Sequence, residues 1–127
     1  MSISAGYHKI KTSSGKYLTL LSQNGTVTAA TATGATNQTW NFQPSGNNWT
    51  ITNTGYNLTT YAYSNGQSAA SVSGNTLSTE WALVPNSGVY SIQLGSNSSN
   101  AWAVGSNDQV TLTGTQLQSV AQQFNVE

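Results

Sequence analysis

The side chains that could act in catalysis are few and widely separated. The chain has three acidic residues, Glu80, Asp108 and Glu127, a single histidine, His8, and no cysteine. Hydrolysis of a glycosidic bond needs two carboxylates facing each other across the sugar, and nucleophilic catalysis needs a hydroxyl or thiol beside an activating base. No sequence motif indicates either arrangement of catalytic groups. No set of potential metal-ligating side chains has the spacing typical of a metal site. We therefore expect a protein that is not an enzyme and that carries neither a cofactor nor a metal.

Neutral polar side chains and aromatic rings are abundant instead. Asn, Gln, Ser and Thr account for 60 of the 127 residues, and the chain also has four Trp and six Tyr. This combination suits the recognition of neutral sugars, because amides and hydroxyls bond to sugar hydroxyls while an aromatic ring covers the apolar face of the sugar. The composition is compatible with a carbohydrate-binding protein, a lectin, whose partners are glycans or glycoproteins.

Two tyrosines make the preferred candidate site. Tyr61 and Tyr63 are two residues apart, so on a strand they share one face. They precede a Ser-Asn-Gly-Gln loop that offers the amides of Asn65 and Gln67. We expect these four side chains to bind the ligand together.

A second candidate combines Trp102 with Asn100 and Asp108. Asp108 lies in a Ser-Asn-Asp-Gln turn, where Asp is common because its carboxylate bonds to the local backbone. The competing interpretation of Trp102 is an aromatic ring in the interior of the fold, and the sequence favours that interpretation.

The elements that must position these residues are short strands. Apolar residues tend to alternate in HKIK, KYLTLL, TVTA and WNF, and β-branched and aromatic residues are frequent. Turn sequences separate the strands, and Asn24-Gly25 and Asn65-Gly66 predict two-residue hairpins with positive φ at both positions. No segment shows a sustained helical apolar stripe, so we expect no long helix.

The strands are arranged in three repeats. Trp40, Trp81 and Phe124 recur at spacings of about 41 to 43 residues, and three isoleucines recur with them, Ile10, Ile51 and Ile92. The repeats run over approximately 1–43, 44–85 and 86–127. Tyr61 and Tyr63 have only aliphatic or small counterparts in the other repeats, so packing symmetry explains them poorly. We predict a single all-β domain, a β-trefoil of about twelve short strands in three pseudo-symmetric repeats.

The repeated motif resembles the Gln-x-Trp repeat of the ricin B-type β-trefoil family. Gln38-Thr39-Trp40 matches it fully, Gln122-Gln123-Phe124 matches it with Phe for Trp, and Thr79-Glu80-Trp81 keeps only the Trp. The small size and the lack of cysteine are most similar to mushroom trefoil proteins, which include both lectins and protease inhibitors. The resemblance implies a sugar-facing role for Asn37 and Gln38.

The other residues that the resemblance implies are missing. The family usually places an Asp after the second-strand aromatic and an aromatic platform on the third strand, where this chain has Thr19 and Ala30. The second and third repeats lack the full set as well. Galactose binding in the usual mode of the family is therefore not expected, and the ligand is expected to contact other residues.

Charge and hydropathy restrict the other partners. Charged residues make up 5% of the chain, and the formal net charge is zero. A protein with three lysines and no basic stripe cannot bind nucleic acid by neutralising phosphates. The sequence has no apolar run of membrane-spanning length and no signal-peptide pattern, so it predicts a cytoplasmic protein, monomeric or homodimeric, with non-classical secretion as the other route.

The competing function is protease inhibition through an exposed loop. Ser22–Thr26, Tyr61–Gln67 and Gly105–Gln109 are the candidate loops, and none of them contains Lys or Arg. A trypsin-like target is therefore disfavoured, and a cysteine or aspartic protease, or an asparagine-directed one, is the expected target of this alternative. A structural or storage role without a specific ligand also fits the low charge.

Overall fold

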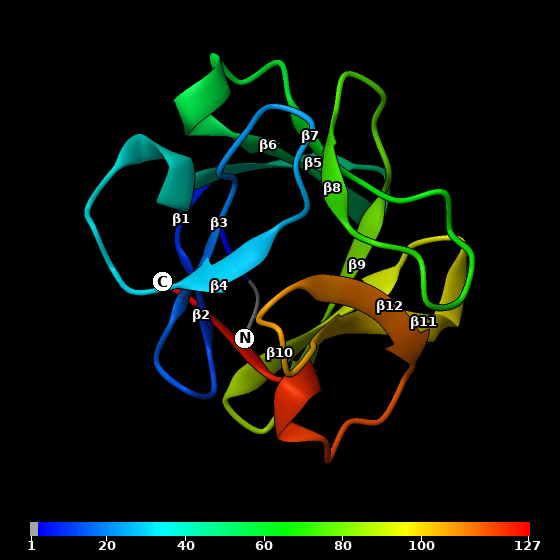
Figure 1. The fold of residues 1–127 in the computed structure, drawn as a ribbon. Helices are drawn as coiled ribbons and strands as arrows, with labels where there is room; N and C mark the ends of the chain where they lie inside the picture. The colour runs from blue at the N-terminus through cyan, green and yellow to red at the C-terminus, as the bar shows by residue number, and fades with distance from the viewer. Residues whose placement is uncertain (1–2) are drawn as a thin grey trace.

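The computed structural model describes residues 3–127 as thirteen strands and three short 3-10 helices (Figure 1). The first repeat contains β1 (Gly6–His8), β2 (Ile10–Thr12), β3 (Tyr17–Thr19), β4 (Thr28–Ala30), η1 (Thr36–Gln38) and β5 (Trp40–Ser45). The second contains β6 (Asn48–Asn53), η2 (Thr54–Tyr56), β7 (Tyr61–Tyr63), β8 (Ser73–Asn75) and β9 (Trp81–Asn86). The third contains β10 (Val89–Leu94), β11 (Asn97–Val104), β12 (Val110–Gly114), η3 (Val120–Gln122) and β13 (Phe124–Val126).

The first and last strands of each repeat form a closed barrel. The pairing order is β1-β5-β6-β9-β10-β13-β2, and β1 and β2 are the two halves of one strand interrupted at Lys9. Because β1 pairs with β5 and β2 pairs with β13, this interrupted strand closes the barrel. Closure leaves no free sheet edge in the barrel.

The middle strands of each repeat form hairpins that cover one end of the barrel. β3 pairs with β4, β7 with β8 and β11 with β12, and Figure 1 shows β4, β8 and β12 arranged around a common centre. The amides of three buried valines connect these hairpins in a ring: Val27 donates to Val72, Val72 to Val110 and Val110 to Val27, over 2.8 to 3.0 Å. This threefold arrangement is a β-trefoil, as the repeats predicted.

The residues that define the repeats form the core. Trp40, Trp81 and Phe124 are completely buried, and so are the three repeated isoleucines, Ile10, Ile51 and Ile92. The indole Nε1 atoms of Trp40 and Trp81 donate hydrogen bonds to the carbonyls of Leu18 and Ala62, over 3.0 and 2.9 Å. Each indole thereby ties the fourth strand of its repeat to the second strand.

The predicted two-residue hairpins are wrong. Asn24-Gly25 lies within the longer connection 20–27 between β3 and β4, and Asn65-Gly66 lies within 64–72 between β7 and β8. Of these four residues only Gly66 has a positive φ, at 84°. The local turn signal failed because these connections extend to the valine ring, where tertiary hydrogen bonds set their path.

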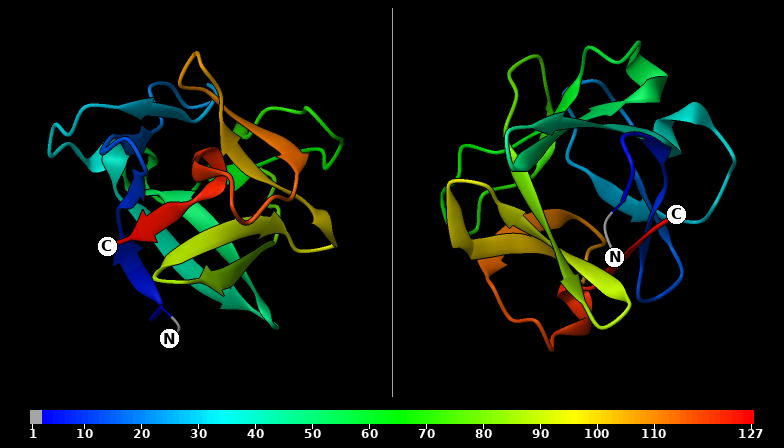
Figure 2. Two further views of the ribbon diagram at one scale, coloured as in Figure 1. Left: turned by 90° about the horizontal axis from the view of Figure 1, so that it is seen from below. Right: turned by 180° about the vertical axis from the view of Figure 1, so that it is seen from behind.

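The connections between the strands give the molecule an irregular outer surface. Figure 2 shows the loops of all three repeats reaching outward around the barrel. Within residues 3–127, no helix has the length and apolar character needed to cross a lipid bilayer.

Candidate functional site

The glutamine of the repeated motif is a structural residue. The Gln38 side chain is 1% exposed, and its Nε2 atom donates to the Thr19 hydroxyl over 3.1 Å and to the Thr31 carbonyl over 2.9 Å. Its Oε1 atom accepts from the Thr33 amide over 2.8 Å. The predicted sugar-facing role of Gln38 is therefore wrong, because its amide is buried and bonded within the protein.

The other repeats confirm this structural role. Gln122 is 4% exposed and makes the corresponding bonds, from Nε2 to the Thr113 hydroxyl and the Gly114 carbonyl, and from the Gln116 amide to its Oε1. In the second repeat the shorter Thr79 takes this position and bonds through its hydroxyl to the backbone of Ser64. Each repeat thus ties its last connection to its second or third strand.

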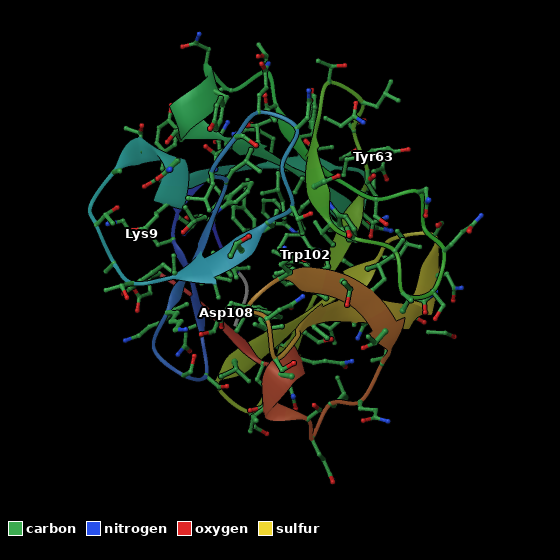
Figure 3. All side chains as sticks on the ribbon, viewed as in Figure 1. Lys9, Tyr63, Trp102 and Asp108 are labelled. Atoms are coloured by element: carbon green, nitrogen blue, oxygen red, sulfur yellow. The ribbon has the colours of Figure 1, made fainter. Side chains whose placement is uncertain are left out.

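Trp102 is not a surface residue. Its side chain is completely buried, and its ring packs edge to face against Trp81 at 5.1 Å and Phe124 at 6.4 Å between centroids. Figure 3 shows Trp102 at the middle of the molecule. The prediction that it contacts a ligand is wrong, because its side chain is completely buried and packs against core rings of β9 and β13. Its Nε1 atom is buried and has no hydrogen-bond partner within residues 3–127.

Asn37 belongs to η1 and packs against η2. Its backbone carbonyl accepts from the Leu20 amide over 3.1 Å and from Asn53 Nδ2 over 3.0 Å. Its Oδ1 atom is buried and is unpartnered within the described residues. A buried acceptor cannot meet a sugar at the surface in this conformation, so only the amide nitrogen of Asn37 remains a candidate contact.

Asp108 forms an ion pair with Lys16. The Nζ–Oδ2 distance is 2.8 Å, and both side chains are 40% exposed. Asp108 has a φ of 65° in the turn between β11 and β12, and the pair connects that turn to the β2–β3 connection. Asp108 borders a shallow cleft of about 260 Å³ that also contains Ser13, Ser106 and Val120.

The two predicted tyrosines share an outward face of β7. Ala62 between them is completely buried, whereas Tyr61 and Tyr63 are half-buried. Tyr61 is paired with Thr52 on one side and Asn75 on the other, and Tyr63 is paired with Ser73, so neighbouring strands fix the position of the tyrosines. We call this surface, with Tyr61, Tyr63, Asn65 and Gln67, the β7 tyrosine face. Figure 3 shows Tyr63 away from the centre of the molecule.

The loop beside these tyrosines is ordered by its own side chains. Asn65 Oδ1 accepts from the Gln67 amide over 3.0 Å, and the Ser64 hydroxyl accepts from the Gly66 amide over 3.1 Å. Both Asn65 and Gln67 are exposed. The Asn65 Nδ2 group and the Gln67 side chain therefore remain available to a ligand on a loop that is already folded, which lowers the entropic cost of binding.

Another cleft, which was not predicted, lies elsewhere on the molecule. It has a volume of about 600 Å³ and is lined by Tyr7, Thr36, Thr39, Thr54, Asn57 and Leu58. We call it the Tyr7–Leu58 cleft. It lies where η1, η2 and β1 come together, and both views in Figure 2 show η1 and η2 near each other. Among residues 3–127, no charged side chain lines it.

Hydrogen bonds between η1 and η2 hold one wall of this cleft. The Thr54 amide donates to the Thr39 carbonyl over 3.0 Å, and the Thr54 hydroxyl donates to the Thr36 carbonyl. Gly55 lies so close to Asn37 that an added Cβ would approach the Asn37 backbone to 3.0 Å. The cleft wall is therefore a packed junction of the first two repeats. Sequence patterns within one repeat cannot show such a junction.

The groups considered for catalysis are apart and engaged in structural contacts. The His8 ring nitrogens lie 2.7 Å from the Ser4 carbonyl and 3.2 Å from the Glu127 carbonyl, and its ring packs edge to face on Phe42. Glu80 accepts a hydrogen bond from the Ser45 hydroxyl over 2.8 Å. Within residues 3–127, no three His, Cys, Asp or Glu side chains gather as metal ligands would.

The pKa of Tyr17 is shifted by a hydrogen bond. The Tyr17 hydroxyl donates to Glu127 Oε1 over 2.8 Å. This hydrogen bond raises the pKa of Tyr17 above its usual value of 10.0, and desolvation and the negative charge of Glu127 act in the same direction. The shift is that of a local structural bond and does not activate a catalytic group.

Solved structures with the same fold include lectins and one enzyme. The Rhizoctonia solani agglutinin has a TM-score of 0.89 at 19% identity, over 99% of this chain and 96% of that chain. The Macrolepiota procera ricin B-like lectin, in complex with lactose, has a TM-score of 0.88 at 16% identity, over 100% and 99%. A Clostridium perfringens endo-β-galactosidase that releases GlcNAcα1-4Gal has a TM-score of 0.83 at 15% identity, over 95% of this chain and 32% of that chain.

These similarities establish the β-trefoil fold. They do not establish an activity, which must be argued from the residues of this chain. No protein-family model matches the sequence, and no curated protein is significantly similar to it. At identities of 15 to 19%, the side chains that a trefoil uses to bind a ligand are free to differ.

Proposed function

We propose that this protein is a lectin that binds neutral glycans without changing them chemically. The observation that carries the proposal is the β7 tyrosine face. Two tyrosine rings point outward from one strand, beside two exposed amide side chains on a preformed loop. Rings of this kind cover the apolar face of a sugar, and the amides bond to its hydroxyls.

The electrostatic character of the surface supports a neutral ligand. Charged residues are 5% of the chain and the net charge is zero, so long-range attraction contributes little to binding. Recognition must then come from contact area and hydrogen bonds, and the affinity should depend weakly on salt concentration. The two fungal lectins of the same fold add support, since one of them was solved with lactose bound.

A glycan array probed with the purified protein tests this function. Tyr61→Ala and Tyr63→Ala should each lose most of the array signal, whereas Tyr63→Phe should keep it, because the ring remains. Leu117→Ala is the matched control, since it removes an exposed apolar side chain in the third repeat. Circular dichroism shows that each variant is folded. An empty array for the folded wild-type protein would disprove the proposal.

The protease-inhibitor alternative has its own measurement. The same protein is assayed against a papain-like cysteine protease and a pepsin-like aspartic protease. Inhibition together with an empty glycan array would replace the lectin proposal. Inhibition that disappears on substitution within Tyr61–Gln67 would then identify the inhibitory loop.

A further inference from the structure

We propose that the Tyr7–Leu58 cleft is a second saccharide site, separate from the β7 tyrosine face. The proposal rests on the proposed glycan-binding function and adds a site to it. The volume of the cleft, about 600 Å³, is in the range of small-ligand sites. Its lining combines a tyrosine ring, an aliphatic side chain, three threonine hydroxyls and an amide.

The exposure of Tyr7 is the first reason. Its side chain is 64% exposed although it belongs to a barrel strand, where Tyr7 pairs with Asn41. The corresponding residues of the other repeats, three positions before Ile51 and Ile92, are Asn48 and Val89. Threefold packing therefore does not require a tyrosine at this position. A ring left exposed beside a cleft offers the flat apolar surface that sugar rings stack on.

The polar groups of the cleft are available to a ligand. Within residues 3–127, the side chains of Thr36, Thr39 and Asn57 make no hydrogen bond to protein groups. Thr36 and Asn57 are also exposed. Together they supply two hydroxyls, which donate and accept, and one amide, which does both through separate atoms. Sugar hydroxyls need this mixture of donors and acceptors, whereas an anionic ligand would need charge that the cleft lacks.

The backbone at the rim of the cleft is strained. Asn57 and Leu58 have φ values of 56° and 60°, and left-handed conformation is unfavourable for leucine in particular. The turn is held by hydrogen bonds from the Leu58 amide to the Asn53 carbonyl and from the Thr59 amide to the Tyr56 carbonyl. This conformation brings the Asn57 amide and the Leu58 side chain to the same cleft. Such strain is often retained where a side chain must face a ligand.

The cleft at the junction of the third and first repeats is a natural comparison. Val120 there corresponds to Thr36, since both stand two residues before the motif glutamine. That cleft is smaller, at about 260 Å³, and contains Asp108 of the ion pair in place of an exposed ring. Val120 is 64% exposed, the same fraction as Tyr7, so Val120→Ala is a matched control for removing an exposed side chain.

The test is a titration of the full chain followed by amide chemical shifts. The ligands are the methyl glycosides of galactose, glucose, mannose and N-acetylglucosamine, and lactose. Tyr7→Ala removes the ring, and Asn57→Gly removes the amide while glycine keeps the positive φ without strain. A double variant, Tyr61→Ala with Tyr63→Ala, disables the β7 tyrosine face.

Binding in the cleft should shift the amide signals of Thr39, Asn57 and Leu58. These shifts should persist in the Tyr61/Tyr63 double variant and in Val120→Ala. Tyr7→Ala and Asn57→Gly should each weaken the cleft affinity about tenfold or more, because each removes one of the two kinds of contact that sugars need.

The outcomes separate the two proposals. Shifts that occur only around residues 61–67, and that Tyr7→Ala leaves unchanged, overturn the cleft proposal and leave the proposed function standing. Amide shifts at the Tyr7–Leu58 cleft without any change around residues 61–67 support the cleft as a saccharide site. They also exclude the β7 tyrosine face as a site for these sugars. No shift with any of the five sugars, in a protein with an empty glycan array, overturns both proposals.

Discussion

Gln38 donates its side-chain amide to the carbonyl of Thr31 over 2.9 Å, and this bond joins the last connection of the first repeat to the end of β4. The bond explains why a polar residue recurs before the repeated core aromatic. Its side chain satisfies backbone groups that would otherwise be left without partners where the sheet ends. The motif therefore marks the fold and not the ligand.

Gln38→Ala should destabilise the protein by about 1 kcal/mol or more, because it removes a buried side chain that is the hydrogen-bond partner of the part-buried Thr31 carbonyl and Thr33 amide. Chemical denaturation measures the change. Gln43→Ala is the control, since Gln43 is exposed and bonds only to the neighbouring Asn41 side chain. Equal stability of the two variants would contradict the structural role of Gln38. Glycan affinity of the folded fraction should be unchanged.

Gly74→Ala should be among the most damaging single-methyl substitutions in the chain. A Cβ at this position would lie 2.1 Å from the Gln23 carbonyl oxygen and 2.9 Å from Thr60 Cγ2. The carbonyl belongs to backbone that cannot move freely, since Gly74 also donates its amide to the Gly25 carbonyl over 2.9 Å. We expect a loss of about 3 kcal/mol, as for overpacked cores.

Gly114→Ala tests the same change where space is open. No atom lies within 4 Å of a Cβ built at Gly114, and its φ is not positive. Alanine there should leave stability unchanged or raise it by up to about 1 kcal/mol, through a less flexible unfolded chain. Relative to the wild-type protein, Gly74→Ala should therefore lower the melting temperature strongly, whereas Gly114→Ala should leave it unchanged or raise it. Similar melting temperatures for the two variants would disprove the crowding at Gly74.

The fold could be predicted because its signal repeats. Trp40, Trp81 and Phe124 occur at the same place in three successive repeats. They are completely buried because they occupy equivalent core positions. Local turn signals were less informative. Asn24-Gly25 has the sequence of a tight hairpin, yet the segment must reach the valine ring at the centre, and those long-range hydrogen bonds outweigh the turn preference.

The site was only partly accessible from the sequence. Tyr61 and Tyr63 could be placed on one face because strand geometry alternates, and the buried Ala62 between them confirms that arrangement. Whether they bind a glycan stays a prediction. The Tyr7–Leu58 cleft joins residues about fifty positions apart through the contact of η1 with η2. No periodicity within a repeat encodes that contact, so sequence patterns could not reveal it.

Asp108→Asn should cost at most about 1 kcal/mol, although it removes the ion pair with Lys16. Both side chains are 40% exposed, and pairs in contact with water contribute little and are screened by salt. Asparagine tolerates the φ of 65° at this position, whereas alanine does not, so Asp108→Ala should cost about 1 kcal/mol more. Denaturation at low and high sodium chloride concentration separates the two contributions. If Asp108→Asn lowers the free energy of unfolding at low salt but not at high salt, the loss comes from the ion pair alone.

Tyr17→Phe should remove part of the alkaline sensitivity of the protein. The pKa of Tyr17 is raised in the folded state, so the folded state favours the protonated phenol. The resulting stabilisation is present below the unfolded pKa of about 10 and is lost as pH rises through the folded value. Between those two pH values, the stability of the wild-type protein should fall more steeply than that of Tyr17→Phe. Parallel denaturation series across this alkaline range measure the slopes, and equal slopes would contradict the bond to Glu127.

Trp102→Phe should cost less stability than Trp40→Phe. Both indoles are completely buried, but Trp40 Nε1 donates to the Leu18 carbonyl, whereas Trp102 Nε1 has no partner within residues 3–127. Replacing Trp40 removes ring volume and leaves a buried carbonyl unpaired, which together should cost about 3 kcal/mol. Replacing Trp102 removes similar volume but also removes a buried donor that is itself unfavourable.

We therefore expect a difference of about 1 to 2 kcal/mol between the two variants, measured by denaturation under identical conditions. Trp81→Phe, whose Nε1 donates to the Ala62 carbonyl, should behave like Trp40→Phe and serves as the internal control. If Trp102→Phe is the most destabilising of the three, then contacts with Trp81 and Phe124 dominate, and the unpaired donor carries little of the energy. If the predicted order holds, the hydrogen bonds of Trp40 and Trp81 account for the preference for Trp over Phe at the repeated core position.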